Sequence, residues 1–96
     1  MDLAHALKVA LETGTVRLGL NETRACVEDQ KARLLIVSRT CPDTELRQER
    51  RFRNVPVYHY EGTAVELGQA CGRPYPISAL AILDPGSSAI LTLEPG

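Results

Sequence analysis

Apolar positions recur along this chain at two periods, one typical of helices and one typical of strands. The first segment has an apolar stripe at helical spacing: Leu3, Ala6, Leu7, Ala10 and Leu11. Asp2 is placed to cap this expected helix, and Gly14 follows its last periodic residue. The continuous apolar run 34–37 is typical of a central strand that is buried on both faces.

Along the whole chain, the pattern predicts helices that alternate with strands. Asn21 is a good N-cap for a second helix, and Thr63 and Glu66 form a capping-box pattern for a later one. The expected strands are 15–18, 34–37, 55–60 and 77–83, and the expected helices are 2–13, 21–29, 43–53, 63–72 and 87–93. Such alternation implies a sheet covered by helices on both faces, so we expect an α/β fold with three layers, an α/β/α sandwich.

The segment 43–53 differs from the other expected helices because it is polar nearly all round. Only Leu46 and Phe52 are strongly apolar, so a helix here must lie on the surface. Its charged residues are Arg47, Arg50, Arg51, Arg53, Glu45 and Glu49. This run fits two interpretations: a solvated, salt-bridged helix face, or a surface that contacts RNA phosphates.

Length and composition bound the class of protein. The chain has 96 residues, enough for one domain over 1–96 and too few for two. No apolar run is long enough to cross a bilayer and no secretory pattern is visible, so we expect a cytosolic protein without membrane contact. Cys26, Cys41 and Cys71 are widely spaced and lack a C-x-x-C pair. We therefore expect reduced thiols, no disulfide framework, no metal and no cofactor.

Charge gives no general support for nucleic-acid binding, because the net charge is −1. The distribution is less even, since residues 1–53 hold ten Lys and Arg against eight Asp and Glu. Neither His5 nor His59 stands in a recognisable catalytic pattern, and no serine or cysteine has a recognisable activating partner. We therefore expect neither an enzyme nor a small-molecule substrate.

The stretch 18–24 joins the end of an expected strand to the start of an expected helix. It presents Gly19 and then Asn21, Glu22 and Thr23, and the free N–H groups of a helix start attract phosphate. A carboxylate can accept hydrogen bonds from a guanine edge, and an amide can pair with an adenine edge. A sheared G·A pair exposes both edges, so a site that binds it needs both a carboxylate and an amide. The local alternative is an ordinary capped turn between strand and helix.

A second candidate site lies at 73–78, where two prolines flank a tyrosine. Tyr75, with the aliphatic Ile77 and the nearby Arg73, resembles a stacking platform for an unstacked base. The alternative is that Tyr75 covers an edge of the core and Arg73 caps the preceding helix.

Four segments together are similar to one known family. They are 14–23 (GTVRLGLNET), 32–42 (ARLLIVSRTCP), 55–61 (VPVYHYE) and 65–91 (VELGQACGRPYPISALAILDPGSSAIL). The chain resembles the L-thirty-e family of archaeal and eukaryotic large-subunit ribosomal proteins, within the L-seven-Ae superfamily of kink-turn binders. The resemblance implies an α/β/α sandwich with a mixed, four-stranded sheet that binds RNA kink-turns.

The resemblance also implies which residues contact RNA. Asn21 and Glu22 would lie at the G·A pairs, and Tyr75 and Ile77 would pack against an extruded nucleotide. The full implied set is Gly19, Asn21, Glu22, Thr23, Arg39, Thr40, Arg73, Tyr75, Ile77 and Ser78. Ala25 stands where the family usually has lysine, so the adjacent Arg24 joins this set as a candidate contact.

We therefore expect a structural, cytoplasmic protein of the large ribosomal subunit. Its expected partners are kink-turn ribosomal RNA and neighbouring ribosomal proteins. The alternatives are a kink-turn-binding component of a small ribonucleoprotein, an RNA-binding protein that regulates its own message, and a protein–protein interaction module.

Overall fold

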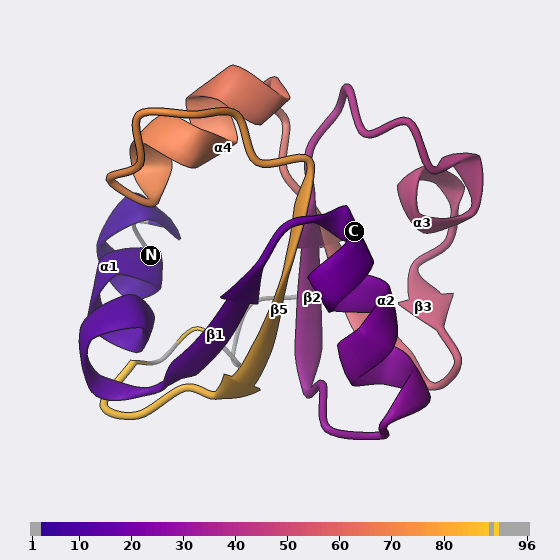
Figure 1. Cartoon of the computed structure of the whole chain (residues 1–96), viewed down its shortest axis with the longest axis horizontal. Helices are drawn as coiled ribbons and strands as arrows, with labels where there is room; N and C mark the ends of the chain where they lie inside the picture. Colours follow the sequence, from indigo (N-terminus) through magenta and orange to yellow (C-terminus); the bar gives the residue numbers. More distant parts are fainter. Residues whose placement is uncertain (1–2, 89, 91–96) are drawn as a thin grey trace.

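The computed structural model describes residues 3–88 and 90 of the chain. This part holds four helices and five strands, which alternate except where the third and fourth strands follow one another directly. Figure 1 shows their arrangement. The helices are α1 (Leu3–Thr13), α2 (Leu20–Glu28), α3 (Thr44–Gln48) and α4 (Ala64–Ala70). The strands are β1 (Thr15–Leu18), β2 (Leu34–Val37), β3 (Arg51–Phe52), β4 (Val55–His59) and β5 (Ala79–Asp84).

The strands form one mixed sheet in the order β1-β5-β2-β4-β3. Strand β5 runs antiparallel to both of its neighbours, β1 and β2, whereas β2 and β4 are parallel. At the centre of the sheet, Leu35 of β2 lies opposite Val57 of β4 on one side and Ala81 of β5 on the other. The ends of β1, β2 and β4 therefore lie at the same edge of the sheet as the start of β5.

Helices cover both faces of the sheet, which confirms the expected three layers. On one face, Leu34 and Ile36 pack in a core with residues of α1 and α4 such as Leu7 and Leu67. On the other face, Leu35 and Val37 pack with α2 and α3. Figure 1 shows the two helix pairs on opposite sides of the strands. Successive residues of β2 belong to different cores because neighbouring side chains of a strand point to opposite faces.

The sheet has five strands rather than the expected four, and the difference comes from the segment 43–53. The structure has a short helix α3, for which Asp43 is the N-cap, followed by the edge strand β3. Leu46 and Phe52 are both buried. Six positions along a helix correspond to a rotation of about 600°, or 240° beyond a full turn. One continuous helix would place these two side chains on different faces, so the chain changes to a strand before Phe52.

Most other boundaries agree with the pattern. The capping box at Thr63 and Glu66 is present at the start of α4. Strand β5 begins at Ala79 rather than at Ile77, because residues 77 and 78 still belong to the preceding loop. The expected cap Asp2 and most of the expected helix 87–93 lie outside the described residues.

Candidate RNA interface

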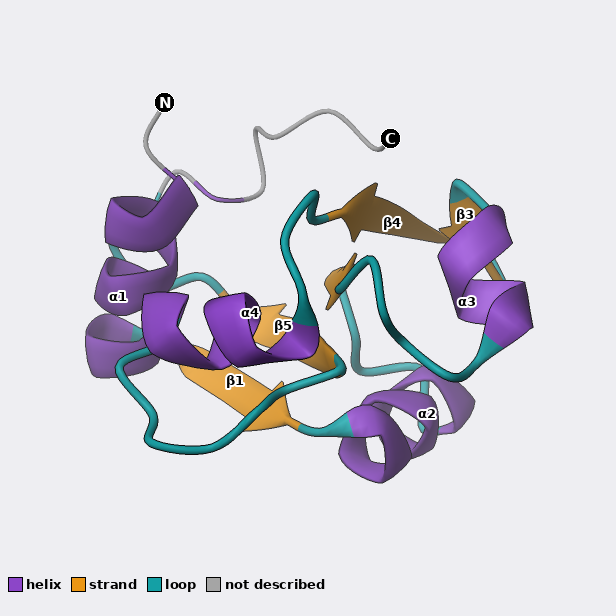
Figure 2. Cartoon of the chain, turned by 90° about the horizontal axis from the view of Figure 1, so that it is seen from above, coloured by secondary structure: helices purple, strands orange, loops and turns teal. Residues whose placement is uncertain are grey.

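Three loops meet at the edge of the sheet where β1, β2 and β4 end and β5 begins. The backbone N–H of Gly19 donates to the carbonyl of Ala79 at 2.8 Å, which joins the start of α2 to the start of β5. The N–H of Ser38 donates to the carbonyl of Ser78 at 2.9 Å, which joins the loop after β2 to the loop before β5. Figure 2 views the molecule from this end. The two stretches singled out in the sequence, 18–24 and 73–78, are therefore neighbours.

The loop after β2 is also tied to the start of α4. The N–H of Arg39 donates to the carbonyl of Gly62 at 2.9 Å, and the Nε of Arg39 donates to the carbonyl of Glu61 at 3.0 Å. The hydroxyl oxygen of Thr40 accepts from the N–H of Ala64 at 2.9 Å. Arg39 and Thr40 remain exposed, so both are available to a ligand at this edge of the sheet.

Helix α2 begins one residue earlier than its sequence suggested. Its N-cap is Gly19, whose φ of 108° and ψ of 155° suit only glycine, and no side chain caps the helix. The prediction that Asn21 is the N-cap is therefore wrong; Asn21 lies in the first turn, where it is exposed with Glu22. An added Cβ at Gly19 would meet nothing within 4 Å, so the space beside this backbone is open.

Two residues of the expected set are buried and cannot offer their side chains to RNA. The hydroxyl of Thr23 donates to the carbonyl of Gly19 at 2.7 Å, and the side chain is fully buried. Ile77 is 2% exposed and belongs to the core on the α1 and α4 face. The expectation that Ile77 packs against a nucleotide is therefore corrected. These two side chains anchor the loops that carry their exposed neighbours.

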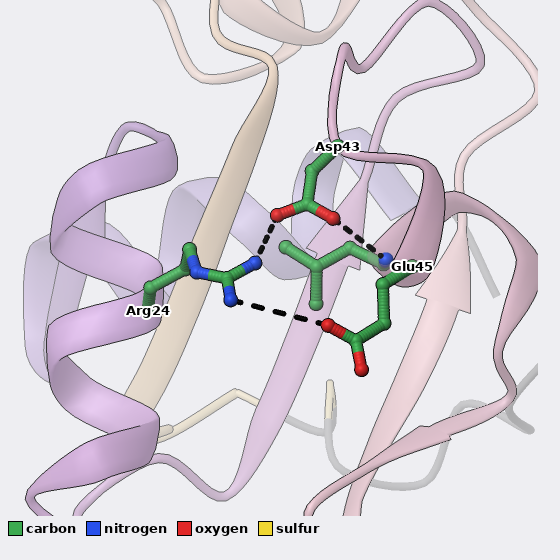
Figure 3. A network of polar contacts seen from close by, with 4 residues as sticks. Arg24, Asp43 and Glu45 are labelled. Atoms are coloured by element: carbon green, nitrogen blue, oxygen red, sulfur yellow. Dashed lines mark hydrogen bonds and ion pairs between the residues drawn. The ribbon is translucent and has the colours of Figure 1, made fainter.

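The guanidinium of Arg24 is already paired with carboxylates of the protein. Its guanidinium pairs with the carboxylate of Asp43 and, at 3.9 Å, with that of Glu45, as Figure 3 shows. The other oxygen of Asp43 accepts from the N–H of Leu46 at 3.2 Å. The guanidinium carbon also lies 5.4 Å from the ring centre of Phe52. This residue, expected as an RNA contact, instead connects α2 to α3 within the protein.

The loop 73–78 lies directly against α4. The N–H of Arg73 donates to the carbonyl of Gly68 at 2.9 Å. A Cβ added at Gly68 would come within 2.1 Å of the carbonyl oxygen of Tyr75. This close approach leaves the Tyr75 side chain 51% exposed, and Arg73 is exposed beside it. The arrangement favours the stacking platform over the interpretation in which Tyr75 covers the core.

Sequence reasoning did not identify Gly68 as a residue that shapes this site. The available signal was a glycine inside a helical pattern, which often marks a close backbone approach. Ser38 was also missed as the residue that links two of the three loops. It follows a wholly apolar strand, and a polar residue at that position is the only signal that the sequence offers.

The described residues offer no clear metal or thiol chemistry at this edge. Within residues 3–88 and 90, no three His, Cys, Asp or Glu side chains are grouped so as to hold a metal ion. Burial raises the pKa of Cys71 from 9.0 to about 11 and also raises the pKa values of Cys26 and Cys41. These thiols are therefore protonated and buried at neutral pH, as expected for reduced structural cysteines. No helix in the described part is long and apolar enough to span a membrane.

Sequence comparison relates nearly the whole chain to known proteins. The profile of the ribosomal protein L7Ae/L30e/S12e/Gadd45 family matches residues 1–92. The large ribosomal subunit protein eL30 of Methanosphaerula palustris is 42% identical over 94 residues, which cover 98% of each chain. That of Methanospirillum hungatei is 44% identical over 98% of this chain and 99% of its own length.

A third relative, the large ribosomal subunit protein eL30 of Methanosarcina mazei, is 44% identical over 95% of this chain and 87% of its own length. Likeness of this degree along nearly the whole chain leaves no segment of the sandwich unmatched by these relatives. The chain belongs to the ribosomal protein L7Ae/L30e/S12e/Gadd45 family.

Proposed function

We propose that this protein is a non-catalytic, cytoplasmic component of the large ribosomal subunit that binds a kink-turn of ribosomal RNA. The observation that carries the proposal is the hydrogen bond between Gly19 and Ala79, which places the α2 start beside the loop of Tyr75. The relatives named large ribosomal subunit protein eL30 support the ribosomal assignment. Neighbouring ribosomal proteins are then its further partners.

At the start of α2, exposed polar groups suit the edges of unpaired or sheared bases. The carboxylate of Glu22 can accept from the N1–H and N2–H of a guanine, and the amide of Asn21 can pair with an adenine. The open space beside Gly19 lets a base or a phosphate approach the backbone closely. An acidic residue in this place weakens attraction to phosphate and increases discrimination between bases.

The other two loops supply charge and a stacking surface. Arg39 and Arg73 are exposed and carry positive charge on the two loops that the Ser38–Ser78 hydrogen bond connects. Tyr75 offers a half-exposed ring on which an extruded base can stack. We propose that an RNA held on the α2 start and on this loop at once is bent. Binding therefore favours the kinked state over the straight one, because only the kinked state makes both sets of contacts.

Substitution of the two polar residues of α2 tests this proposal. We expect Glu22→Ala and Asn21→Ala each to weaken binding to a kink-turn RNA by roughly tenfold, the cost of one lost base contact. Binding to a duplex of the same composition should change little, and the melting temperature should be retained because both side chains are exposed. Isothermal titration with both RNAs measures this discrimination.

Glu28→Ala is the matched control, since Glu28 is an exposed glutamate at the other end of the same helix. Unchanged preference for kinked RNA in both variants would refute the proposed interface. Co-sedimentation with large subunits at moderate salt tests the ribosomal assignment separately. A protein that binds kink-turns but never sediments with subunits would belong to another ribonucleoprotein.

A further inference from the structure

A pocket of about 510 Å³ lies beside the proposed interface, where β2 and β4 end. The N–H of Tyr60 donates to the carbonyl of Val37 at 2.8 Å, which holds the two strand ends together. The pocket is lined by Ser38, Arg39, Arg47, His59, Tyr60 and Glu61. Only Arg39 of these six belongs to the interface proposed above, so most of the pocket has no assigned role.

Ser38 has the strongest unmet requirement of any side chain in the lining. It is 1% exposed, and its hydroxyl is the only buried side-chain oxygen or nitrogen in residues 3–88 and 90 without a hydrogen-bond partner. Leaving a buried hydroxyl unpaired is unfavourable, because the group has lost its hydrogen bonds to water and gained none in exchange. A ligand in the pocket that accepts or donates one hydrogen bond would remove this cost.

The charged groups of the lining suit a ligand with one negative charge. The Nε of Arg39 is used by the carbonyl of Glu61, and Nη1 of Arg47 lies 3.4 Å from the carbonyl of Cys41. Each guanidinium has five N–H donors, so most donors of both arginines remain available. Glu61 is the single carboxylate of the lining. Two positive charges and one negative charge leave the pocket with a net charge that matches a phosphate monoanion.

The pocket also contains the imidazole ring of His59, and its volume is too large for a phosphate group alone. His59 is held in place because its Nε2 lies 3.2 Å from the carbonyl of Leu46, an acceptor that requires the proton on Nε2. Tyr60 also lines the pocket at the end of β4, but its ring packs on the α1 and α4 face of the sheet. Aromatic rings and guanidinium planes are the surfaces on which unstacked bases pack.

We propose that this pocket binds one nucleotide, with its phosphate at Arg39 and Arg47 and its base against the ring of His59. The arginines and the ring of the lining together fit a ligand that carries one phosphate and one base, which is a nucleoside monophosphate unit. Its source is a strand of the bound RNA that leaves the interface past Arg39 and Thr40, and this part rests on the proposed function. A free mononucleotide offers the same base and sugar, with a phosphate that carries a further negative charge, so the two sources need separate measurements.

The first measurement uses adenosine monophosphate and the free protein. In ¹⁵N-resolved NMR titrations, we expect it to shift the amides of residues 38–39, 47 and 59–61 more than adenosine or inorganic phosphate does. Arg47→Gln should weaken this binding about tenfold, the effect of losing a hydrogen bond to a charged group. Arg33→Gln is the matched control, because Arg33 is an exposed arginine just before β2, at the opposite end of that strand.

Ser38→Ala separates a ligand-binding role from a purely structural one. We expect this variant to bind adenosine monophosphate more weakly and yet to melt at a higher temperature, because it loses an unpaired buried hydroxyl. Absence of amide shifts at millimolar adenosine monophosphate would overturn the proposal. An Arg33→Gln effect equal to that of Arg47→Gln would also overturn it, since binding would then follow net charge alone.

The second measurement identifies the source of the nucleotide. We expect Arg47→Gln to weaken binding to a kink-turn RNA that carries an unpaired flanking strand, and to leave a fully trimmed kink-turn unaffected. Equal affinities of wild type and Arg47→Gln for the flanked RNA would exclude RNA as the source. The effect of Glu22→Ala on kink-turn affinity does not depend on the effect of Arg47→Gln. The two variants therefore test the proposed interface and the pocket separately.

Discussion

Arg24 shows how the role of one residue depends on what lies across from it. In the sequence it follows the candidate motif and stands beside Ala25, so it is a natural phosphate contact. In the structure its guanidinium is satisfied by Asp43 and Glu45, and its side chain is 39% exposed against 14% for Asp43. The ion pair fixes the N-cap residue of α3 against α2. We therefore propose that this arginine does not replace the lysine that the family usually has at position 25.

At the residue scale, we predict that Arg24→Ala lowers the free energy of unfolding by about 1 kcal/mol and leaves kink-turn affinity unchanged. The estimate is that of a partly exposed ion pair whose carboxylate is left half-buried. Chemical denaturation and RNA titration measure the two effects. Arg17→Ala, an exposed arginine of β1, is the control for loss of charge. A loss of RNA affinity greater than that of the control would show that Arg24 contacts RNA.

Helix α4 positions the Tyr75 loop through backbone hydrogen bonds and a close approach at Gly68, in addition to the burial of Ile77. The carbonyl of Gly68 accepts from the N–H of Arg73, and the chain at Tyr75 passes over the same glycine. The N–H of Ile77 donates to the carbonyl of Ala64 at 2.9 Å, which fixes the other end of the loop. The loop is thus held against the helix at both ends, and the ring of Tyr75 is left outside.

At the element scale, we predict that Gly68→Ala displaces this loop and weakens kink-turn binding. The new Cβ would lie 2.1 Å from the carbonyl oxygen of Tyr75, so the backbone must move. Overpacking of this kind costs about 1–3 kcal/mol of stability. Thermal melting and RNA titration check both effects, with the exposed neighbour Gln69→Ala as control. Wild-type affinity in a destabilised Gly68→Ala variant would show that the loop does not contact RNA.

Across the whole molecule, basic side chains lie on more than one surface. In the described part of the chain, both ion pairs involve Arg24, and Glu45 pairs with it rather than with the arginines that follow. Arg50 and Arg51 are exposed, and Arg53 lies with its guanidinium carbon 5.5 Å from the ring centre of Phe52. The salt-bridged helix face, one of the two interpretations of this run, is therefore not formed among the described residues, which leaves these charges available to phosphates.

At the scale of the whole molecule, we predict that Arg50→Ala changes the salt dependence of RNA binding and not the preference for kinked RNA. One lost phosphate contact reduces the slope of log K against log salt by about one. Titrations at several salt concentrations measure this slope. Equal slopes for the variant and the wild type would mean that Arg50 is solvated in the complex, as the alternative interpretation holds.

Much of the fold follows from short-range patterns in the sequence. The run 34–37 indicates a central strand because all of its side chains are apolar, and it is buried on both faces. The capping box at Thr63 and Glu66 likewise marks the start of α4. The segment 43–53 could not be predicted in the same way, since its two apolar anchors, Leu46 and Phe52, lie six positions apart and one helix does not place them on one face.

The amino-acid sequence alone is enough to predict the layered α/β architecture and the order of its main elements. It also contains the motifs that resemble a kink-turn binder. These depend on residues a few positions apart, whose spacing decides whether apolar side chains share a face. Three contacts are visible only in the folded chain: the hydrogen bond between Gly19 and Ala79, the hydrogen bond between Ser38 and Ser78, and the ion pair between Arg24 and Asp43. Each of these contacts joins residues far apart in the chain, and strand pairing and helix packing bring them together.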